Sequence, residues 1–410
     1  MPTREGLPES QELRIWAPCH TVPVRPTPDG RRWLSACAVA APTVLAAALV
    51  AWTSANTPLW RDEFATRQYA SMDLPDLLAA TSHVDAVLVP YYALIHALSG
   101  FTGLGAGMRI WSALAFVAAV ALIGMLALRW WGRTAAAMAA TMLAVNGSVL
   151  AQATNARPYT LALCGIALAS FCLDLALRDP STTSPPAKEP RGTRSGIPVL
   201  AWLGYAVAAL VAVLLQPFAA TALVATVVLV RSRRILVRWM LTSAPWATAT
   251  VLVLMAGRGQ TDQLAWVTPA GPMDVSRNVT LAAGLADGRL PVHATLIVLM
   301  AILAVILSTR RRSVVFAAAA IAMPVVLLVA VSLLVHPVVN WRYLLWVALG
   351  VALLAGAAVG VLVRGRGPIL VRLTPAGIAI GLVATMAWSA VGGVILPSPR
   401  RDDFPAAVSR

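Results

Sequence analysis

Long apolar runs separated by short polar loops extend along most of this 410-residue chain. A helix needs roughly 20 apolar residues to cross about 30 Å of hydrocarbon. This pattern predicts an all-α fold, a polytopic integral membrane protein with about 11 transmembrane helices. The predicted spans lie near 34–53, 108–128, 135–153, 158–177, 198–215, 217–231, 239–256, 292–308, 314–335, 343–363 and 374–395.

One further apolar stretch, residues 86–98 (AVLVPYYALIHAL), is too short for a span at about 13 residues, and it contains Pro90 and His96. Such a segment is typical of a re-entrant or interfacial helix. It lies in the large first loop, and whether it crosses the membrane decides the side of every later loop.

The distribution of basic residues decides between the two topologies, because cytoplasmic loops are enriched in Lys and Arg. If residues 86–98 do not cross, 16 of the basic residues beyond residue 99 are cytoplasmic and nine are extracytoplasmic. If they cross, the cluster Arg310 to Arg312 is translocated. The charges therefore predict a multi-pass protein of the plasma (inner) membrane with a cytoplasmic N-terminus and an extracytoplasmic C-terminus.

Composition supports this class of protein, since 59% of residues are hydrophobic and 12% are charged. The net charge of +15 comes mainly from short clusters between apolar runs, which argues against nucleic acid as a partner. We expect a disordered cytoplasmic tail at 1–33, one transmembrane domain at 34–395 with a Pro-rich cytoplasmic linker at 178–197, and a short extracytoplasmic tail at 396–410.

Acidic residues gather in the first extracytoplasmic loop, beginning with adjacent Asp62 and Glu63. A carboxylate at the lipid surface could serve as a general base, and the alternative is a solvated loop. Neighbouring side chains of a helix or strand face different points, so one of the two should be chemical and the other structural. His83 and Asp85 would share one side of an extended segment, or Asp85 could cap the following helix. These four residues could together bind a divalent cation, although they match no known ligand spacing and no cofactor is firmly implied.

Two arginines stand at the extracytoplasmic starts of predicted helices, Arg157 before Pro158 and Arg342 before Tyr343. A planar guanidinium there is suited to binding a phosphate, and the alternative is an interfacial anchor. Extracytoplasmic arginines oppose the positive-inside bias, which favours the functional interpretation.

The segments WRDE (60–63), HVDAVLVPYY (83–92), ARPY (156–159) and RYLL (342–345) resemble the C-type glycosyltransferases (GT-C) that use polyprenyl-phosphate sugars. The nearest branch is similar to protein O-mannosyltransferases, aminoarabinose transferases and actinobacterial mannosyltransferases. The resemblance covers most of the chain from residue 50 onward. Relatives often have H-P-P where this chain has His83-Val84-Asp85, and a His-aromatic pair where it has Gln216-Pro217-Phe218.

This resemblance implies an inverting mannosyl- or other hexosyltransferase that acts on the extracytoplasmic face of the cell envelope. The transmembrane domain would be catalytic, and the acceptor would be a glycan, lipid or protein. Asp62 corresponds to the base that activates the acceptor hydroxyl, with Glu63 as its neighbour, while Arg157 and Arg342 correspond to ligands of the lipid phosphate. The matched segments add the remaining candidate substrate-binding residues, His83, Asp85, Tyr91, Tyr159 and Tyr343.

Two other classes of function remain as alternatives. A transporter or flippase for a lipid-linked substrate would have a similar number of spans, but carriers usually keep ionisable residues near the membrane midplane. Here the acidic residue within a predicted span is Asp174, close to its cytoplasmic end. An inactive family member with a scaffold role in envelope assembly is the third class.

Overall fold

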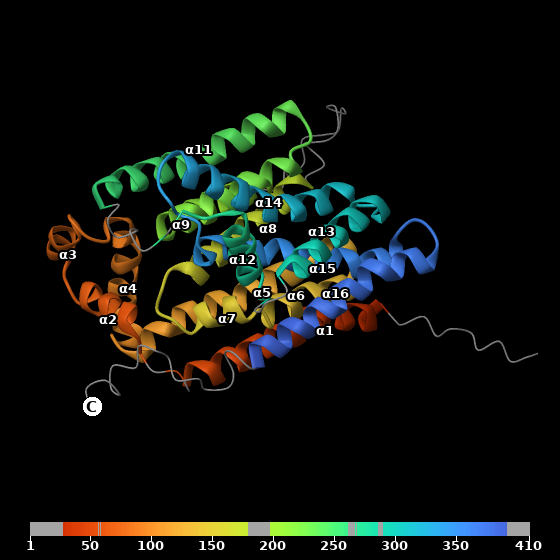
Figure 1. The fold of residues 1–410 in the computed structure, drawn as a ribbon, viewed down its shortest axis with the longest axis horizontal. Coiled ribbons are helices and arrows are strands. Elements are labelled where there is room, and N and C mark those ends of the chain that lie inside the picture. Colours follow the sequence, from red (N-terminus) through yellow and green to blue (C-terminus); the bar gives the residue numbers. More distant parts are fainter. Residues whose placement is uncertain are drawn as a thin grey trace, which may run out of the picture.

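The computed structural model describes residues 28–55, 57, 59–178, 197–260, 267, 269–285 and 290–391. The predicted linker and both predicted tails therefore lie almost entirely outside the described residues. The described part is helical, and its longer helices run along one common direction in Figure 1. This confirms the predicted all-α membrane fold, in which helices satisfy the backbone hydrogen bonds that lipid cannot.

A helix or a broken helical segment lies at each of the eleven predicted spans, and seven of the described helices, or eight if the bent pair is one span, are long and apolar enough to cross a membrane. Those long and apolar enough to cross a membrane are α1 (Pro28–Ala55), α5 (Arg109–Trp131), α8 (Tyr159–Leu177), α11 (Arg233–Ala256), α14 (Arg311–Leu334), α15 (Val347–Arg364) and α16 (Ile369–Ala390). The others coincide with the bent pair α6 (Arg133–Ala144) and α7 (Gly147–Ala153), with α9 (Ile197–Leu215), with the broken segment η4 (Pro217–Ala219), α10 (Ala220–Leu223) and η5 (Val224–Leu229), and with α13 (Leu290–Leu307).

The span predicted near 135–153 is formed by two helices, α6 and α7, which are bent by 61° relative to each other. Asn146 stands at the break, and its side-chain Oδ1 accepts a hydrogen bond from Val149 N at 3.0 Å. An asparagine that caps a new helix start in this way ends the preceding one. The bend precedes the short turn that carries Arg157.

Close helix packing in the core depends on small residues, as expected where lipid supplies no hydrophobic driving force between helices. The central helix α15 is almost wholly buried. A Cβ placed on Gly356 of α15 would lie 2.8 Å from the Ala135 carbonyl oxygen, and one on Gly165 of α8 would lie 2.8 Å from Ala212 Cβ of α9. Side chains larger than hydrogen would push these helices apart.

The short helices of the first loop gather at one end of the bundle, which we call the α2–α4 end (Figure 1). They are α2 (Arg61–Ala70), α3 (Leu74–Thr81), the 3-10 turn η1 (Ala86–Leu88) and α4 (Val89–Thr102). At 1.5 Å per residue, α4 is only about 21 Å long, shorter than the hydrocarbon layer. A further 3-10 turn, η2 (Ala106–Met108), leads from α4 into α5.

The opposite end of the bundle contains a buried ion-pair network around Asp174 of α8. Its carboxylate accepts hydrogen bonds from Arg129 Nε at 2.7 Å, Trp130 Nε1 at 2.7 Å and Arg178 Nε at 3.1 Å. A carboxylate engaged by three donors is a structural crosslink between α5 and α8. This position does not resemble the midplane acidic site of a carrier.

Candidate active site

A buried ion pair between Glu63 and Arg109 organises the α2–α4 end. Glu63 lies in the first turn of α2 and is fully buried. Arg109, the first residue of α5, donates from Nε to Oε1 at 2.7 Å and from Nη2 to Oε2 at 2.6 Å. The backbone N–H groups of Trp60 and Ala156 donate to the same carboxylate at 3.1 and 2.9 Å, and Arg109 Nη1 donates to the Thr57 carbonyl oxygen at 2.6 Å. Glu63 therefore accepts four hydrogen bonds, which leaves its oxygens no free direction for chemistry.

The turn between α7 and α8, residues 154–158, is held against this pair through its backbone. Thr66 Oγ1 of α2 donates to the Ala156 carbonyl oxygen at 3.1 Å, and Ser112 Oγ of α5 donates to the Arg157 carbonyl oxygen at 3.2 Å. Because these two hydrogen bonds hold the backbone of the turn, the position from which the Arg157 side chain extends is fixed.

The Asp62 carboxylate lies between two arginines that are far away in the sequence. Its Oδ2 is 3.5 Å from Arg157 Nη2 and 3.9 Å from Arg342 Nη1. The Asp62 side chain is 22% exposed, while that of Glu63 is completely buried. Neighbouring residues of one helical turn thus reach different surroundings, and the more accessible carboxylate faces the guanidinium groups.

Arg342 is positioned by two tryptophan rings and by a 3-10 turn, η7 (Trp341–Leu344). Its guanidinium carbon lies 5.2 Å from the centre of the Trp60 ring and 5.7 Å from that of Trp341. Asn278 of α12 (Pro272–Ala282) accepts a hydrogen bond from Trp341 N at 2.8 Å. The loop after α11 therefore contributes to the same site.

Tyrosines surround the two arginines. Tyr91 and Tyr92 of α4 are fully buried, Tyr159 begins α8, and Tyr343 of η7 packs on Phe218 with ring centres 4.8 Å apart. Burial raises the pKa of the Tyr343 phenol, and the neighbouring Tyr159 acts in the same direction while Arg157 opposes both. A neutral phenol is a hydrogen-bond donor, which suits an anionic ligand.

Two buried donors of this cluster, Arg157 Nε and Tyr91 Oη, have no hydrogen-bond partner among the described residues. Buried polar groups are normally paired, so each such group calls for an explanation. An anion beside Asp62 would supply acceptor oxygens to the arginine.

The structure does not place His83 with Asp85 on one side of an extended segment. Asp85 has a left-handed backbone with φ of 61°, and its Oδ2 accepts a hydrogen bond from Tyr92 Oη at 3.0 Å. No side-chain cap hydrogen bond joins Asp85 to η1, the turn that it precedes. His83 is exposed, and no described hydrogen bond or ion pair joins it to the arginines. Asp85 thus reaches the tyrosine cluster, whereas His83 is exposed.

No group of three or more His, Cys, Asp or Glu side chains in the described part of the chain could hold a metal ion. The four residues considered for a cation are instead separated: Glu63 binds Arg109, Asp62 faces Arg157 and Arg342, and Asp85 binds Tyr92.

Several residues that build the site were not singled out in the sequence. Arg109 was one extracytoplasmic arginine among nine, and its partner Glu63 is 46 residues away. Asn278 and Gln260 had no signal in the sequence, although Asn278 accepts a hydrogen bond from Trp341 N and Gln260 Nε2 donates to the Thr81 and Ser82 carbonyl oxygens at 3.1 Å. Their roles are long-range contacts, which no local pattern encodes.

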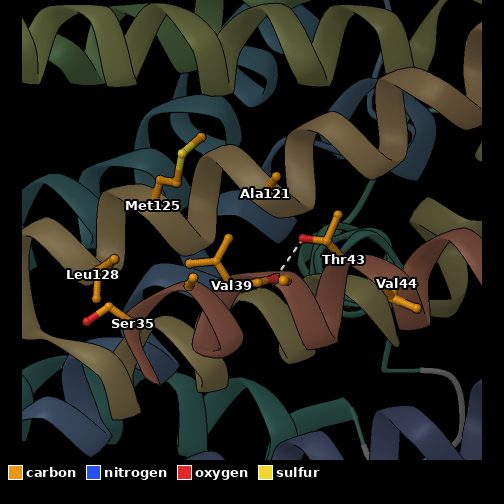
Figure 2. Close-up of a pocket in the computed structure, with 9 residues that line it drawn as sticks. Ser35, Val39, Thr43, Val44, Ala121, Met125 and Leu128 are labelled. Carbon is orange, nitrogen blue, oxygen red and sulfur yellow. Dashed lines mark hydrogen bonds between the residues drawn. The ribbon is translucent and has the colours of Figure 1, made fainter. Parts of the chain in front are cut away.

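A groove of about 450 Å³ lies elsewhere, between α1 and α5 (Figure 2). Val39 and Val44 of α1 and Ala121 and Met125 of α5 line it, and its Thr43 hydroxyl donates to the Val39 carbonyl oxygen at 2.8 Å. The groove is apolar and separate from the cluster around Asp62.

The arrangement of the helices has a counterpart among solved structures. This chain shares its fold with ArnT. The similar structure is the crystal structure of ArnT from Cupriavidus metallidurans in the apo state, with a TM-score of 0.50 and 14% sequence identity over 87% of this chain and 77% of that chain. No protein-family model matches the chain, and no curated protein matches it. At this identity the likeness to ArnT establishes the fold.

The two adjacent carboxylates should respond differently to loss of charge. We expect Glu63→Gln to lower the free energy of unfolding by about 3–5 kcal/mol, because it leaves Arg109 buried without a counter-ion. Asp62→Asn, which changes a partly exposed carboxylate, should cost about 1 kcal/mol or less. Thermal unfolding of the purified variants in detergent would measure both, and equal losses would contradict the structural assignment of Glu63.

Proposed function

We propose that this protein is an inverting glycosyltransferase that moves a sugar from a polyprenyl-phosphate donor to an acceptor hydroxyl at the membrane surface. The observation that carries the proposal is the Asp62 carboxylate between the guanidinium groups of Arg157 and Arg342, at 3.5 and 3.9 Å. A base beside a phosphate-binding pair is the arrangement that glycosyl transfer from a lipid phosphate requires.

The shared fold supports this proposal, because ArnT is an aminoarabinose transferase and a GT-C enzyme. The residues around Asp62 come from the segments that resemble that class: WRDE, ARPY and RYLL. We propose mannose or another hexose as the sugar and a glycan, lipid or protein as the acceptor, in the branch that contains the actinobacterial mannosyltransferases.

In the proposed reaction, Asp62 accepts the proton of the acceptor hydroxyl as its oxygen attacks the anomeric carbon. A new C–O bond forms on one face of the sugar, and the bond from the anomeric carbon to the phosphate oxygen breaks on the other. The bonding electrons leave with the polyprenyl phosphate, and Arg157 and Arg342 stabilise the added negative charge. The configuration at the anomeric carbon is therefore inverted.

Arg157 and Arg342 link the binding of the donor phosphate to the ability of Asp62 to act as a base. Arg157 Nη2 and Arg342 Nη1 face Asp62, while Arg157 Nε is a buried donor without a partner in the described part. A donor phosphate that engages these guanidinium groups competes with Asp62 for them. The Asp62 oxygens then become available to the acceptor hydroxyl when the donor is bound.

Glu63, Tyr91, Tyr159, Tyr343 and Asp85 have supporting roles in this proposal. Glu63 holds α2 and the 154–158 turn in place through Arg109 and Ala156. Tyr91 Oη, a buried donor without a described partner, is available to the donor phosphate or sugar. We propose the same role for the phenols of Tyr159 and Tyr343. Asp85 orients Tyr92 from the edge of the cluster.

We further propose that the α2–α4 end is extracytoplasmic, with the N-terminus in the cytoplasm and the C-terminus outside. With cysteines introduced into a cysteine-free background, Ser82→Cys should react with a membrane-impermeant maleimide from outside the cell. Arg311→Cys should react only after the membrane is opened. Both residues are exposed, and labelling of position 311 in intact cells would reverse the proposed topology.

Removing the proposed base should affect turnover rather than donor binding. We expect Asp62→Asn to lower sugar transfer by about 10² to 10⁴-fold, the usual contribution of a general base. Donor affinity should be unchanged or slightly higher, because Asn competes less well for the two arginines. The measurement is the transfer of labelled mannose from polyprenyl-phosphate mannose in membranes, together with the binding of this donor.

Asp76→Asn is the matched control for this experiment, since Asp76 is an exposed carboxylate of the neighbouring helix α3. It should retain normal transfer. Wild-type transfer by Asp62→Asn, inserted at normal yield, would exclude Asp62 as the base and remove the main support for the enzymatic proposal.

Replacing Arg157 by lysine should weaken donor binding while keeping the charge. Lysine lacks the planar fork, so we expect a loss of about 1–3 kcal/mol in donor affinity, the scale of a hydrogen bond to a charged group. Arg67→Lys is the matched control, because Arg67 is exposed on α2. If donor affinity is unchanged in Arg157→Lys and also in Arg157→Ala, Arg157 is an interfacial anchor and not a phosphate ligand.

A further inference from the structure

A second cleft lies at the end of the bundle opposite to α2–α4, where the last turns of α5 and α15 meet the linker between α13 and α14. Its volume is about 180 Å³, several times the roughly 30 Å³ of one water in the liquid. The lining residues are Trp130, Trp131, Ser308, Thr309, Arg310, Gly360, Val361, Arg364 and Gly365.

The tryptophan side of this cleft carries an unpaired donor. Trp131 is only 5% exposed, and its indole Nε1 is buried without a hydrogen-bond partner among the described residues. The neighbouring Trp130 is satisfied, because its Nε1 donates to Asp174 at 2.7 Å. The two rings pack edge to face with centres 5.2 Å apart, which fixes the orientation of Trp131. Trp131 lines the cleft, and its unpaired indole N–H is suited to an acceptor oxygen supplied by a ligand.

The lining of the cleft also carries positive charge. The Arg364 guanidinium lies against Gly132, where a Cβ would be 3.2 Å from Arg364 Nη2. Neither Arg364 nor Arg310 has an ion pair in the described part of the chain. The nearby carboxylate of Asp174 is already engaged by Arg129 and Arg178. The cleft therefore combines two guanidinium groups that no described carboxylate neutralises.

The side chain of Arg364 is not needed to cap the C-terminal end of α15. The side chain of Arg372 fulfils that role, since its Nη1 donates to the Leu362 and Gly365 carbonyl oxygens at 3.2 and 3.4 Å. Two carbonyl groups at the end of α15 are therefore already bound by the charged side chain of Arg372.

We propose that this cleft binds a phosphate group, with Arg310 and Arg364 as the charged ligands and Trp131 Nε1 as a neutral donor. Guanidinium groups bind phosphate oxygens by charge-assisted hydrogen bonds, and basic clefts between membrane helices commonly hold anionic lipid headgroups. Val363 precedes the lining residue Arg364, and Ile369 and Leu370 begin α16 a few residues after Gly365; these three apolar side chains are exposed and could contact the chains of such a lipid. A soluble phosphate presents the same oxygens without the chains.

The test uses the purified full-length protein in neutral detergent with two probes, phosphatidic acid and inorganic phosphate. Native mass spectrometry measures retention of phosphatidic acid against phosphatidylcholine, and thermal unfolding measures the shift caused by phosphate. Arg310→Ala/Arg364→Ala should weaken phosphatidic acid binding about tenfold or more, and Trp131→Phe, which keeps the ring and removes the N–H, by about threefold.

The matched control is Arg233→Ala/Arg234→Ala, which removes two exposed arginines from the first turn of α11. It should change binding less than twofold. An equal loss in this control would show that general surface charge retains the lipid, and unchanged binding in the cleft variants would also overturn the proposal.

Arg310→Lys/Arg364→Lys keeps the charge and guards against a folding defect. It should elute normally in size-exclusion chromatography and bind between the wild type and the double alanine variant. Variant-sensitive binding of phosphatidic acid alone identifies a lipid site, and a variant-sensitive shift with inorganic phosphate identifies a site for a soluble anion. If neither probe responds to the cleft variants, the cleft is not a phosphate site.

Discussion

The buried ion pair between Glu63 and Arg109 is the interaction on which the α2–α4 end depends. Removing both charges from water costs several kcal/mol per ion, and two direct hydrogen bonds do not offset that cost alone. The N–H groups of Trp60 and Ala156 and the Thr57 carbonyl oxygen complete the hydrogen bonding of the pair. Because these partners belong to the first loop and the 154–158 turn, and Arg109 belongs to α5, the ion pair fixes the loop and the turn relative to α5.

The position of Asp62 follows from the burial of Glu63. Successive residues of a helix differ by about 100° in direction, so a helix that buries Glu63 beside Arg109 turns Asp62 toward another surface. That surface contains Arg157, whose backbone Ser112 holds, and Arg342, which lies between Trp60 and Trp341. The proposed base and phosphate ligands thus obtain their geometry from contacts that take no part in the chemistry.

Much of this architecture could be predicted because a bilayer imposes simple rules. Apolar length identified all eleven helical segments, and the resemblance selected Asp62, Arg157 and Arg342, which the structure brings together. At 83–85 the sequence left two alternatives open, an extended segment or Asp85 at a helix start, and the structure places Asp85 before η1 with a left-handed backbone that depends on its tertiary surroundings. Apolar length alone did not predict the bend within 135–153, where Asn146 caps a new helix.

The two ends of the bundle use arginine in opposite ways. At the α2–α4 end, Arg109 is buried with Glu63, and Arg157 and Arg342 face Asp62, so each of these guanidinium groups has a carboxylate near it. At the other end Asp174 forms ion pairs with Arg129 and Arg178, whereas Arg310 and Arg364 have no ion pair among the described residues. Positive charge without counter-charge favours cytoplasmic placement and also attracts anions. The charge distribution that would orient the chain therefore also concentrates anion-binding capacity at the Arg310–Arg364 cleft.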